Sequence, residues 1–450
     1  MRKVQPPAPL PIRLPAPELP RPPLPSPPAP RAVSRLPEIL FAATVLLLSA
    51  IRLIQAHDDF LHRPAFDWSA SEWMIDYAAG FVRRGLGGTL LLHLLRLTGW
   101  GFFPVLAIFT TTLYLGLCAG LVAVSWRLRG PALWRFALLF NPLLLLSICD
   151  YGTIARRDTL FLWGTLLHVL LGEWLLRRPR TRASALWLAV SVAALALVLA
   201  LLHEGIFLFL WLPLNLALFS YLLAQMHCRR RAIALLLLVA FAPALLAVAA
   251  SALRHGDLRT AQAICRSWRF ALPLACSPGG ALPPALDALT WSLPRALSLS
   301  LAYAWRFPLY PLLYALFGAL QVLAVHRLQP TARLAHLLAL LAFPFAAALP
   351  LFLLGVDWGR WLSLLALSSL IVMLSSLRPA LYSWLPAALR PASRHSLRPL
   401  AALRRAVESN PLLFCALLLF VPIPPIPKMA VAFLNPPLIV LRFLLQRFAS

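Results

Sequence analysis

The sequence predicts an all-α protein, a polytopic transmembrane helical bundle of about 11–12 spans with short interfacial helices in the first outer loop. Of its 450 residues, 61% are hydrophobic and 12% are charged, whereas soluble domains carry about 25% charged residues. Its mean hydropathy of +0.79 implies more apolar surface than a soluble fold can bury. Apolar runs recur along the chain without β-barrel alternation. These observations exclude a cytosolic enzyme and a secreted disulfide scaffold.

The predicted spans follow the apolar runs, because a helix needs about 20 apolar residues to cross a bilayer. Asn141-Pro142 and residues 213–215 interrupt two runs and predict kinks, since proline cannot donate the helical hydrogen bond. The runs cover residues 38–55, 103–126, 134–149, 159–176, 183–202, 205–226, 232–252, 300–326, 336–355, 361–377 and 410–424, with a weaker one at 429–446.

The chain divides into four predicted segments. Residues 1–37 are rich in proline and arginine, which predicts a disordered cytoplasmic tail. Residues 38–377 form the main transmembrane domain with an outward-facing site. Residues 378–409 form a basic cytoplasmic loop, and residues 410–450 supply one or two further spans. We expect an even number of spans, which returns the C-terminal arginines to the cytoplasm.

The net charge of +26 comes almost entirely from arginine, since Lys3 and Lys428 are the only lysines. In a soluble chain such charge suggests nucleic acid. Here the arginines lie in short loops, where positive charge sets membrane orientation. We therefore expect no nucleic-acid partner and a cytoplasmic N-terminus. The loops predicted to be cytoplasmic carry Arg127, Arg129 and Arg135; Arg177, Arg178, Arg180 and Arg182; Arg229, Arg230 and Arg231; Arg327 and Arg333; and the arginines from Arg378 to Arg405.

The alternate loops are predicted to face outward, and they hold most of the 15 acidic residues. These acids occur beside arginine and tryptophan, which favours a site at the outer membrane–water boundary. Cys265 and Cys276 share one outer loop, and whether they pair in an oxidising compartment stays open. The outer acids are Asp58, Asp59, Asp67, Glu72, Asp76, Asp150, Asp158, Glu204, Asp257, Asp287 and Asp357.

The first outer loop carries the longest motif. Residues 71–82 predict a short helix with Ser69 or Ser71 as its cap. Arg83 and Arg84 follow, and their planar guanidinium forks suit phosphate oxygens. The glycines beside them allow tight turns and close approach to a ligand. Residues 90–97 are mostly leucine and predict an amphipathic helix on the membrane surface. The alternative is an interfacial helix whose charges only meet lipid headgroups.

A second outer motif places Arg156 and Arg157 at the start of a span. The helix dipole disfavours cations at that end, so the two arginines need anionic partners. Asp150 and Asp158 are one possible set of partners. A bound phosphate is the other.

Two shorter motifs complete the outer face. His203-Glu204 is the polar break between two long apolar runs, where ionisable groups are costly and usually functional. A tight turn with an incidental polar pair is the alternative. Asp357 and Arg360 are three residues apart and can pair locally. Alternatively, Arg360 holds an anion while Trp358 or the next tryptophan stacks on a sugar.

Together these strings resemble bacterial polytopic envelope proteins of the glycan-assembly kind. Over about residues 38–377 the layout is similar to the GT-C superfamily of lipid-linked-sugar glycosyltransferases, and also to O-antigen and exopolysaccharide repeat-unit polymerases. In the GT-C pattern an acid early in the first outer loop is the base, and Asp58 and Asp59 occupy that position. The strings are Gly80-Phe81-Val82-Arg83-Arg84-Gly85-Leu86-Gly87, Arg156-Arg157-Asp158, His203-Glu204 and Asp357-Trp358-Gly359-Arg360-Trp361.

The hypothesis is glycosyl transfer from or onto a polyprenyl-phosphate-linked sugar at the outer face of the bacterial inner membrane. Arginines would hold the phosphate, and an acid would take the proton of the acceptor hydroxyl. Membrane lipid and the lipid-linked sugar are the expected partners, and the oligomeric state stays open. No cofactor or metal site is expected, although paired carboxylates can hold a divalent metal. The candidate catalytic residues are Asp58, Asp59, Asp76 and Glu204, and the candidate substrate-binding residues are Arg83, Arg84, Arg156, Arg157, Asp158, His203, Asp357, Trp358 and Arg360.

Two other classes of function remain as alternatives. The first is a flippase for lipid-linked glycans or another transporter. Transporters place ionisable groups near the midplane on repeated, broken helices, whereas the acids here crowd the outer edge and the sequence shows no repeat. The second is a non-catalytic membrane scaffold.

Overall fold

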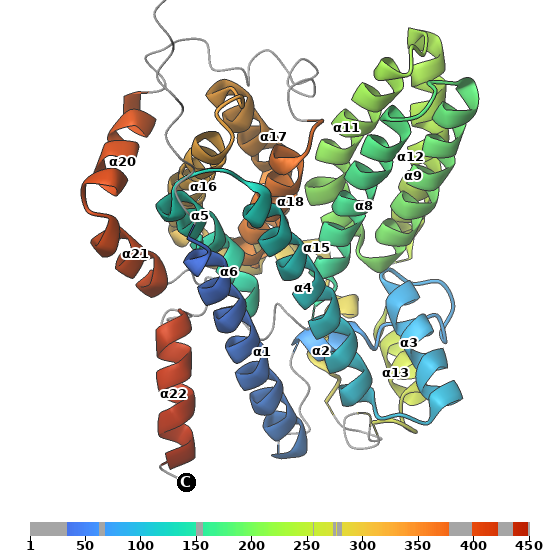
Figure 1. Ribbon diagram of the computed structural model, residues 1–450. Helices are drawn as coiled ribbons and strands as arrows, with labels where there is room; N and C mark the ends of the chain where they lie inside the picture. The colour runs from blue at the N-terminus through green and yellow to red at the C-terminus, as the bar shows by residue number, and fades with distance from the viewer. Residues whose placement is uncertain are drawn as a thin grey trace, which may run out of the picture. The chain divides into compact units, whose positions relative to one another are not determined.

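The computed structural model confirms the all-α fold class (Figure 1). It describes residues 34–62, 68–149, 156–254, 256–272, 276, 281–377, 398–421 and 435–448, and these contain helices but no strand. The described residues belong to one compact unit, Ser34–Ser450. Nearly all of the proline-rich tail, Asp150 and most of the basic 378–409 loop lie outside the described residues.

Eight helices in the described ranges are long and apolar enough to cross a membrane, so the protein is a multi-pass membrane protein. Each falls on one of the predicted apolar runs. They are the Leu36–Gln55 part of α1 (Leu36–His62), α4 (Phe102–Arg127), α8 (Asp158–Leu176), α9 (Arg182–Leu202), the continuous run of α10 (Glu204–Ile206), η1 (Phe207–Trp211) and α11 (Leu212–Gln225), α12 (Arg230–Leu253), the run from η3 (Ala304–Arg306) through α16 (Leu309–Leu328), and α17 (Leu334–Leu354).

Shorter helices account for the other predicted runs. The predicted kink at Asn141 is confirmed, because the Asn141 side chain accepts the Leu143 amide at 3.0 Å and a new helix begins at Pro142. The residues of the second predicted kink, 213–215, lie in the first turn of α11, just after π-helical η1. The shorter helices are α5 (Ala132–Leu139), α6 (Pro142–Cys149), α18 (Trp358–Leu374), α20 (Arg398–Ser409), α21 (Pro411–Phe420) and α22 (Pro436–Phe448).

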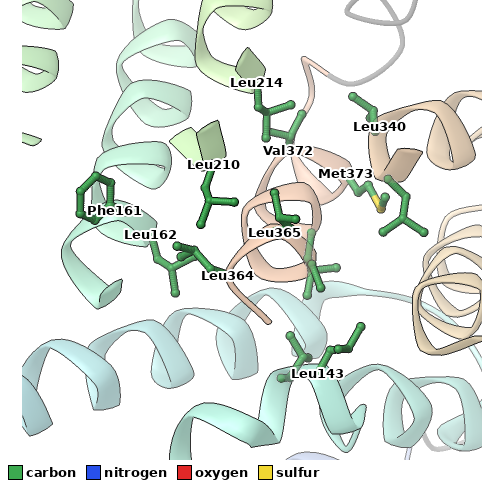
Figure 2. Close-up of a cluster of buried hydrophobic side chains, with 14 of the residues drawn as sticks. Leu143, Phe161, Leu162, Leu210, Leu214, Leu340, Leu364, Leu365, Val372 and Met373 are labelled. Atoms are coloured by element: carbon green, nitrogen blue, oxygen red, sulfur yellow. The ribbon is translucent and has the colours of Figure 1, made fainter. Parts of the chain in front are cut away.

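Helix α18 lies at the centre of the main hydrophobic core. It is apolar around most of its circumference, as expected for a helix with neighbours on all sides, and it packs against α6, α8, α16, α17 and η1. Figure 2 shows Leu364, Leu365 and Val372 of α18 among side chains of these neighbours, including Leu143 and Leu162. The first turn of α18, which carries Arg360, is therefore held on a well-packed support.

A second hydrophobic core lies where α4 begins, and it joins the first long loop to the loop that follows α12. Trp268 is its centre: the ring is fully buried, packs edge-to-face on Phe102 and donates its indole N–H to the Met74 carbonyl at 2.7 Å. The elements of this region, which we call the second layer, are α2 (Trp68–Glu72), α3 (Gly85–Thr98), α13 (Leu258–Ser267), α14 (Pro284–Asp287) and η2 (Ala288–Thr290), whereas the following α15 (Leu293–Ala302) packs against α17.

Cys265 and Cys276 form a disulfide bond in the second layer, which resolves the pairing that the sequence leaves open. The bond closes the segment that carries Trp268. A further link crosses between the two loops, because the Ala285 amide donates to the Ser71 hydroxyl at 3.1 Å. A disulfide bond and hydrogen bonds therefore hold together the two loops that form the second layer.

The predicted helix over residues 71–82 is wrong. The helix α2 ends at Glu72, and residues 73–84 form turns. Two local features compete with the helix. The Asp76 side chain accepts the Ala78 amide at 2.8 Å, and Gly80 adopts a φ of 94°. Residues 90–97 are helical and belong to α3.

The C-terminal helix α22 corrects the expected placement of the C-terminal arginines. It packs along α1 and runs in the same direction (Figure 1). Arg447, near its end, forms an ion pair with Asp58, near the end of α1. The C-terminus therefore lies on the same side as the acid-rich loops, not on the side where α1 begins, because an acid on the acid-rich side attracts this arginine.

A buried ion pair fixes the opposite end of the bundle, where α1 and α5 begin. Nη1 of Arg135 lies 2.9 Å from Oε1 of Glu38, and the Ser125 hydroxyl donates to the same oxygen at 2.8 Å. Arg135 also donates to the Ser34 carbonyl. Both charged side chains are completely enclosed. A buried charge is tolerated only while its partner is present.

We predict that Arg135→Ala lowers the free energy of unfolding by about 3–5 kcal/mol, because it leaves the Glu38 carboxylate buried and unpaired. Replacing both partners, Glu38→Met with Arg135→Met, should cost clearly less. Thermal unfolding of the three purified proteins in one detergent measures the difference. Equal losses in the single and the double variant would contradict a buried pair.

Candidate functional site

Arginines and carboxylates from separate segments meet where α9 ends and α8 and α18 begin. Nε of Arg84, just before α3, lies 3.2 Å from both carboxylate oxygens of Glu204, the first residue of α10. Nη1 of Arg84 lies 3.8 Å from Oε1 of Glu72, the last residue of α2. The arginine–carboxylate cluster, as we call it, consists of Glu72, Arg84, Arg156, Arg157, Asp158, Glu204, Asp357 and Arg360, with His203 among them.

The α18 half of the cluster is built on Asp357. Its Oδ2 lies 2.9 Å from Nη1 of Arg156 and 2.7 Å from Nη2 of Arg360. Burial alone would raise the pKa of Asp357, but the two arginines hold it below its ordinary value. Nε of Arg360 also lies 3.3 Å from Oδ2 of Asp158. The predicted local pair of Asp357 and Arg360 is confirmed, whereas Asp158 partners Arg360 and not its neighbouring arginines.

Arg157 joins the segments of the cluster through their backbones. Its guanidinium donates to the carbonyls of Arg84 at 2.6 Å and Leu202 at 2.9 Å, and also to the carbonyl of Glu72. The Trp73 ring stacks against it with 5.1 Å between the guanidinium carbon and the ring centroid. Its burial, partly offset by Glu72, lowers the pKa of Arg157 to about 10, so it stays charged at neutral pH.

Arg84 has a strained backbone that orients its carbonyl toward Arg157. Its φ of 65° lies in the left-handed region, which disfavours side chains other than glycine. The neighbouring glycines serve the loop itself rather than a ligand. A Cβ at Gly88 would lie 2.1 Å from the Ile75 carbonyl oxygen, and one at Gly85 would lie 2.2 Å from the Tyr77 ring. Strain of this kind concentrates at functional sites.

Glu72 and His203 lie between the Arg84–Glu204 pair and the α18 half of the cluster. Nε2 of His203 is 3.6 Å from Oε1 of Glu72, and its Nδ1 accepts the Ile206 amide at 3.4 Å, which caps α10. Burial and the charges of the surrounding arginines hold the pKa of His203 well below its ordinary value, so the ring is neutral. Glu72 was missed as a site residue, because its only signal in the sequence is that it is an outer acid.

The cluster has a buried tier and a partly exposed tier. Glu72, Arg157 and Arg360 are 4% exposed or less. The side chains of Arg84 and Glu204 are 19% and 17% exposed, and that of Asp357 is 19% exposed. Among the described side chains of the cluster, those of the Arg84–Glu204 pair and Asp357 are therefore the most accessible from outside the protein. A ligand would meet these three side chains while the buried tier supports them.

Two of the predicted catalytic acids, Asp58 and Asp76, lie outside the cluster. Asp58 pairs with Arg447, and Asp59 belongs to α1 although its side chain lies outside the described parts. Asp76 is buried in the second layer and accepts the Ser267 hydroxyl at 2.7 Å. Burial raises the pKa of Asp76, partly offset by its hydrogen bonds. Among the predicted catalytic acids whose side chains the structure describes, Glu204 alone contacts the arginines of the cluster.

Two predicted binding residues sit at its margins. Arg83 donates to the Ala288 carbonyl at 2.7 Å and so ties the motif to the second layer. Trp358 is 1% exposed, packs edge-to-face on Phe307 and Tyr310, and donates its indole N–H to the Gly355 carbonyl at 2.6 Å. Trp358 is therefore a core residue whose ring is not open to a sugar.

Comparison with known proteins identifies a family. The family model of the uncharacterised membrane protein Rv1490 matches residues 39–274, more than half of the chain. The chain belongs to this family. The matched region contains Glu72, Arg84, Arg157 and Glu204, whereas Asp357 and Arg360 follow it. Neither the curated proteins nor the solved structures provide a match. Among the described side chains, no group of three or more His, Cys, Asp and Glu is arranged to hold a metal ion.

We predict that Arg84→Gly is more stable than Arg84→Ala by about 1 kcal/mol. Both variants lose the guanidinium, but only glycine adopts a positive φ without strain. Denaturant unfolding in detergent compares them directly, with Arg96→Gly and Arg96→Ala in the last turn of α3 as a control pair in which glycine should be the less stable. Equal stability of the two Arg84 variants would argue against the left-handed backbone.

The raised pKa of Asp76 predicts a pH dependence of stability. Because the folded protein binds this proton more tightly than the unfolded chain, the contribution is fully present below the ordinary pKa of 3.8 and is lost as the pH rises through the raised value. Relative to Asp76→Asn, the unchanged protein should gain stability on going from about pH 7 to about pH 4. Unfolding temperatures of both proteins across this range test the sign, and a relative loss would contradict it.

Proposed function

We propose that the protein is an integral-membrane enzyme that transfers a glycosyl group from or onto a polyprenyl-phosphate-linked sugar at the outer face of the bacterial inner membrane. The observation that carries the proposal is the partly exposed Arg84–Glu204 pair at the membrane boundary. It places a phosphate-binding guanidinium and a proton-accepting carboxylate in direct contact. A lipid-linked phosphate presents its charge at the same depth.

The proposed roles follow from the two tiers. Arg84, with Arg83 beside it, holds the phosphate of the lipid-linked sugar and stabilises the charge that develops on it as the glycosidic C–O bond breaks. Glu204 takes the proton of the acceptor hydroxyl while the hydroxyl oxygen bonds to the anomeric carbon. The buried Arg157 keeps the backbone of Arg84 in place. Glu204 is preferred over Asp58, since Asp58 is paired with Arg447.

Two observations support an outward-facing site. The disulfide between Cys265 and Cys276 lies in the second layer, on the same side as the cluster, and disulfides persist in oxidising compartments. The loops at the other end of the spans are rich in arginine, which is typical of the cytoplasmic side. Both favour a cytoplasmic start for α1 at Leu36 and an outer position for Arg84.

We predict that deleting the gene changes the surface and lipid-linked glycans of the host. Collapse of a long glycan ladder to a single repeat would identify a polymerase, and uniform loss of one sugar would identify a single-sugar transferase. Gel analysis of both glycan pools beside the parent strain measures this. An unchanged profile would overturn the proposal and favour the transporter alternative.

Complementation then tests the site. Glu204→Gln should lower transfer at least ~100-fold, because a positioned general base contributes about 10²–10⁴-fold. Glu408→Gln makes the same chemical change in a partly exposed ion pair with Arg327, which lies in the last turn of α16. This control variant should restore the glycan profile fully. Protein levels in the membrane fraction must match in both strains. Full restoration by Glu204→Gln would exclude this residue as the base.

A further inference from the structure

The partly exposed Arg84–Glu204 ion pair is fully formed in the structure. Three contacts of 3.2 Å join the Arg84 guanidinium to the Glu204 carboxylate, so the fork that suits a phosphate is already filled by a carboxylate. A phosphate and Glu204 compete for the same donors. Any anion that binds Arg84 through this fork has to displace Glu204 from it.

We infer that the Arg84–Glu204 ion pair is a latch that the phosphate of the substrate opens: phosphate oxygens replace Glu204 on Arg84, and the released carboxylate becomes available to take a proton. This inference rests on the proposed function and specifies how its site is switched on. In the free protein, the proposed base is held by the same cation that later binds the phosphate.

The structure fixes Arg84 as the stationary partner. Its carbonyl is held by Arg157, which is itself anchored on Leu202 and Glu72, and its left-handed backbone is set by that arrangement. Glu72 remains 3.8 Å from Arg84 on the buried side, so the guanidinium keeps one carboxylate after the other leaves. Displacement therefore exchanges the exposed anion without stripping Arg84 of all its partners.

Glu204 is the partner with room to leave. It is the first residue of the three-residue helix α10, directly after the extended backbone of His203 and just before the π-helix η1. Its side chain belongs to the exposed tier, whereas the Glu72 carboxylate beneath it is enclosed. A rotation of the Glu204 side chain is enough to free the fork.

The charges of the site favour phosphate as the displacing anion. Arg83 and Arg84 are neighbours whose charges repel, and burial together with this repulsion lowers the pKa of Arg83. Glu204 supplies one negative charge beside these two cations. The phosphate of the linked sugar is a diester that also carries one negative charge, and it becomes a monoester with up to two when the glycosidic C–O bond breaks. The positive charge of Arg83 and Arg84 is therefore offset most on the departing phosphate.

A binding experiment with farnesyl phosphate as the probe tests the latch in the full-length protein. Dissociation constants are measured by calorimetry in one detergent. If Glu204 competes with phosphate, Glu204→Gln should bind farnesyl phosphate at least ~10-fold more tightly than the unchanged protein, since a charge-assisted contact no longer has to be broken. The same variant loses transfer, so affinity and turnover move in opposite directions.

Asp287→Asn is the matched control, because it removes one exposed carboxylate of the second layer whose partner is Arg295 and not an arginine of the cluster. An equal gain in Asp287→Asn would mean that only net charge matters and would overturn the latch. Weaker or unchanged binding by Glu204→Gln, with clear binding by the unchanged protein, would overturn the latch and leave the proposed function standing. No binding by any of the three proteins would overturn both.

A measurement on the unchanged protein covers the case in which Glu204→Gln does not fold. Carbodiimide labelling of Glu204, followed by peptide mass spectrometry, reports how accessible the carboxylate is. Farnesyl phosphate should speed the labelling of Glu204 and leave that of Glu408 unchanged. Slower or unchanged labelling of Glu204 under saturating probe would contradict release of the carboxylate.

Discussion

The guanidinium of Arg157 is completely buried, and its donors bind the backbone carbonyls of three segments that are far apart in the sequence. A buried cation is stable only if its hydrogen bonds are satisfied and counter-charges lie near. The end of α2, the loop before α3 and the end of α9 therefore have to converge on it. Because Arg84 and Glu204 belong to these segments or directly adjoin them, the exposed pair of the site depends on this one buried side chain.

The same constraint explains the division into tiers. Charges beneath the surface require partners within a few ångströms, and Asp357 satisfies two arginines at once while Asp158 serves the inner side of Arg360. Helix α18 can carry this polar turn because the rest of it is surrounded by apolar side chains (Figure 2). The apolar packing of α18 offsets the cost of burying charges at its first turn. A ligand would meet the few side chains of the cluster that remain partly exposed.

Two anchors at opposite ends hold the bundle around this site. The second layer closes over the ends of the helices through the Cys265–Cys276 bond and the Trp268 contacts, and Arg83 reaches it through Ala288. At the other end, the Glu38–Arg135 pair joins the start of α1 to α5. The family match at residues 39–274 includes Arg135, most of the cluster and Cys265. Their partners Glu38 and Cys276 lie just outside it.

The sequence by itself determined what depends on neighbours a few residues away. Apolar runs of span length, the break at Asn141 and the pairing of Asp357 with Arg360 follow from helix geometry and local hydrogen bonding. Only the tertiary structure decided which distant charges meet. Arg84 contacts Glu204 across 120 positions, Glu72 enters the cluster, and Asp58 and Asp76 do not. The reason is physical: helix periodicity fixes separations of three or four residues, whereas contacts between segments depend on how the apolar helices pack and on where buried charges find partners.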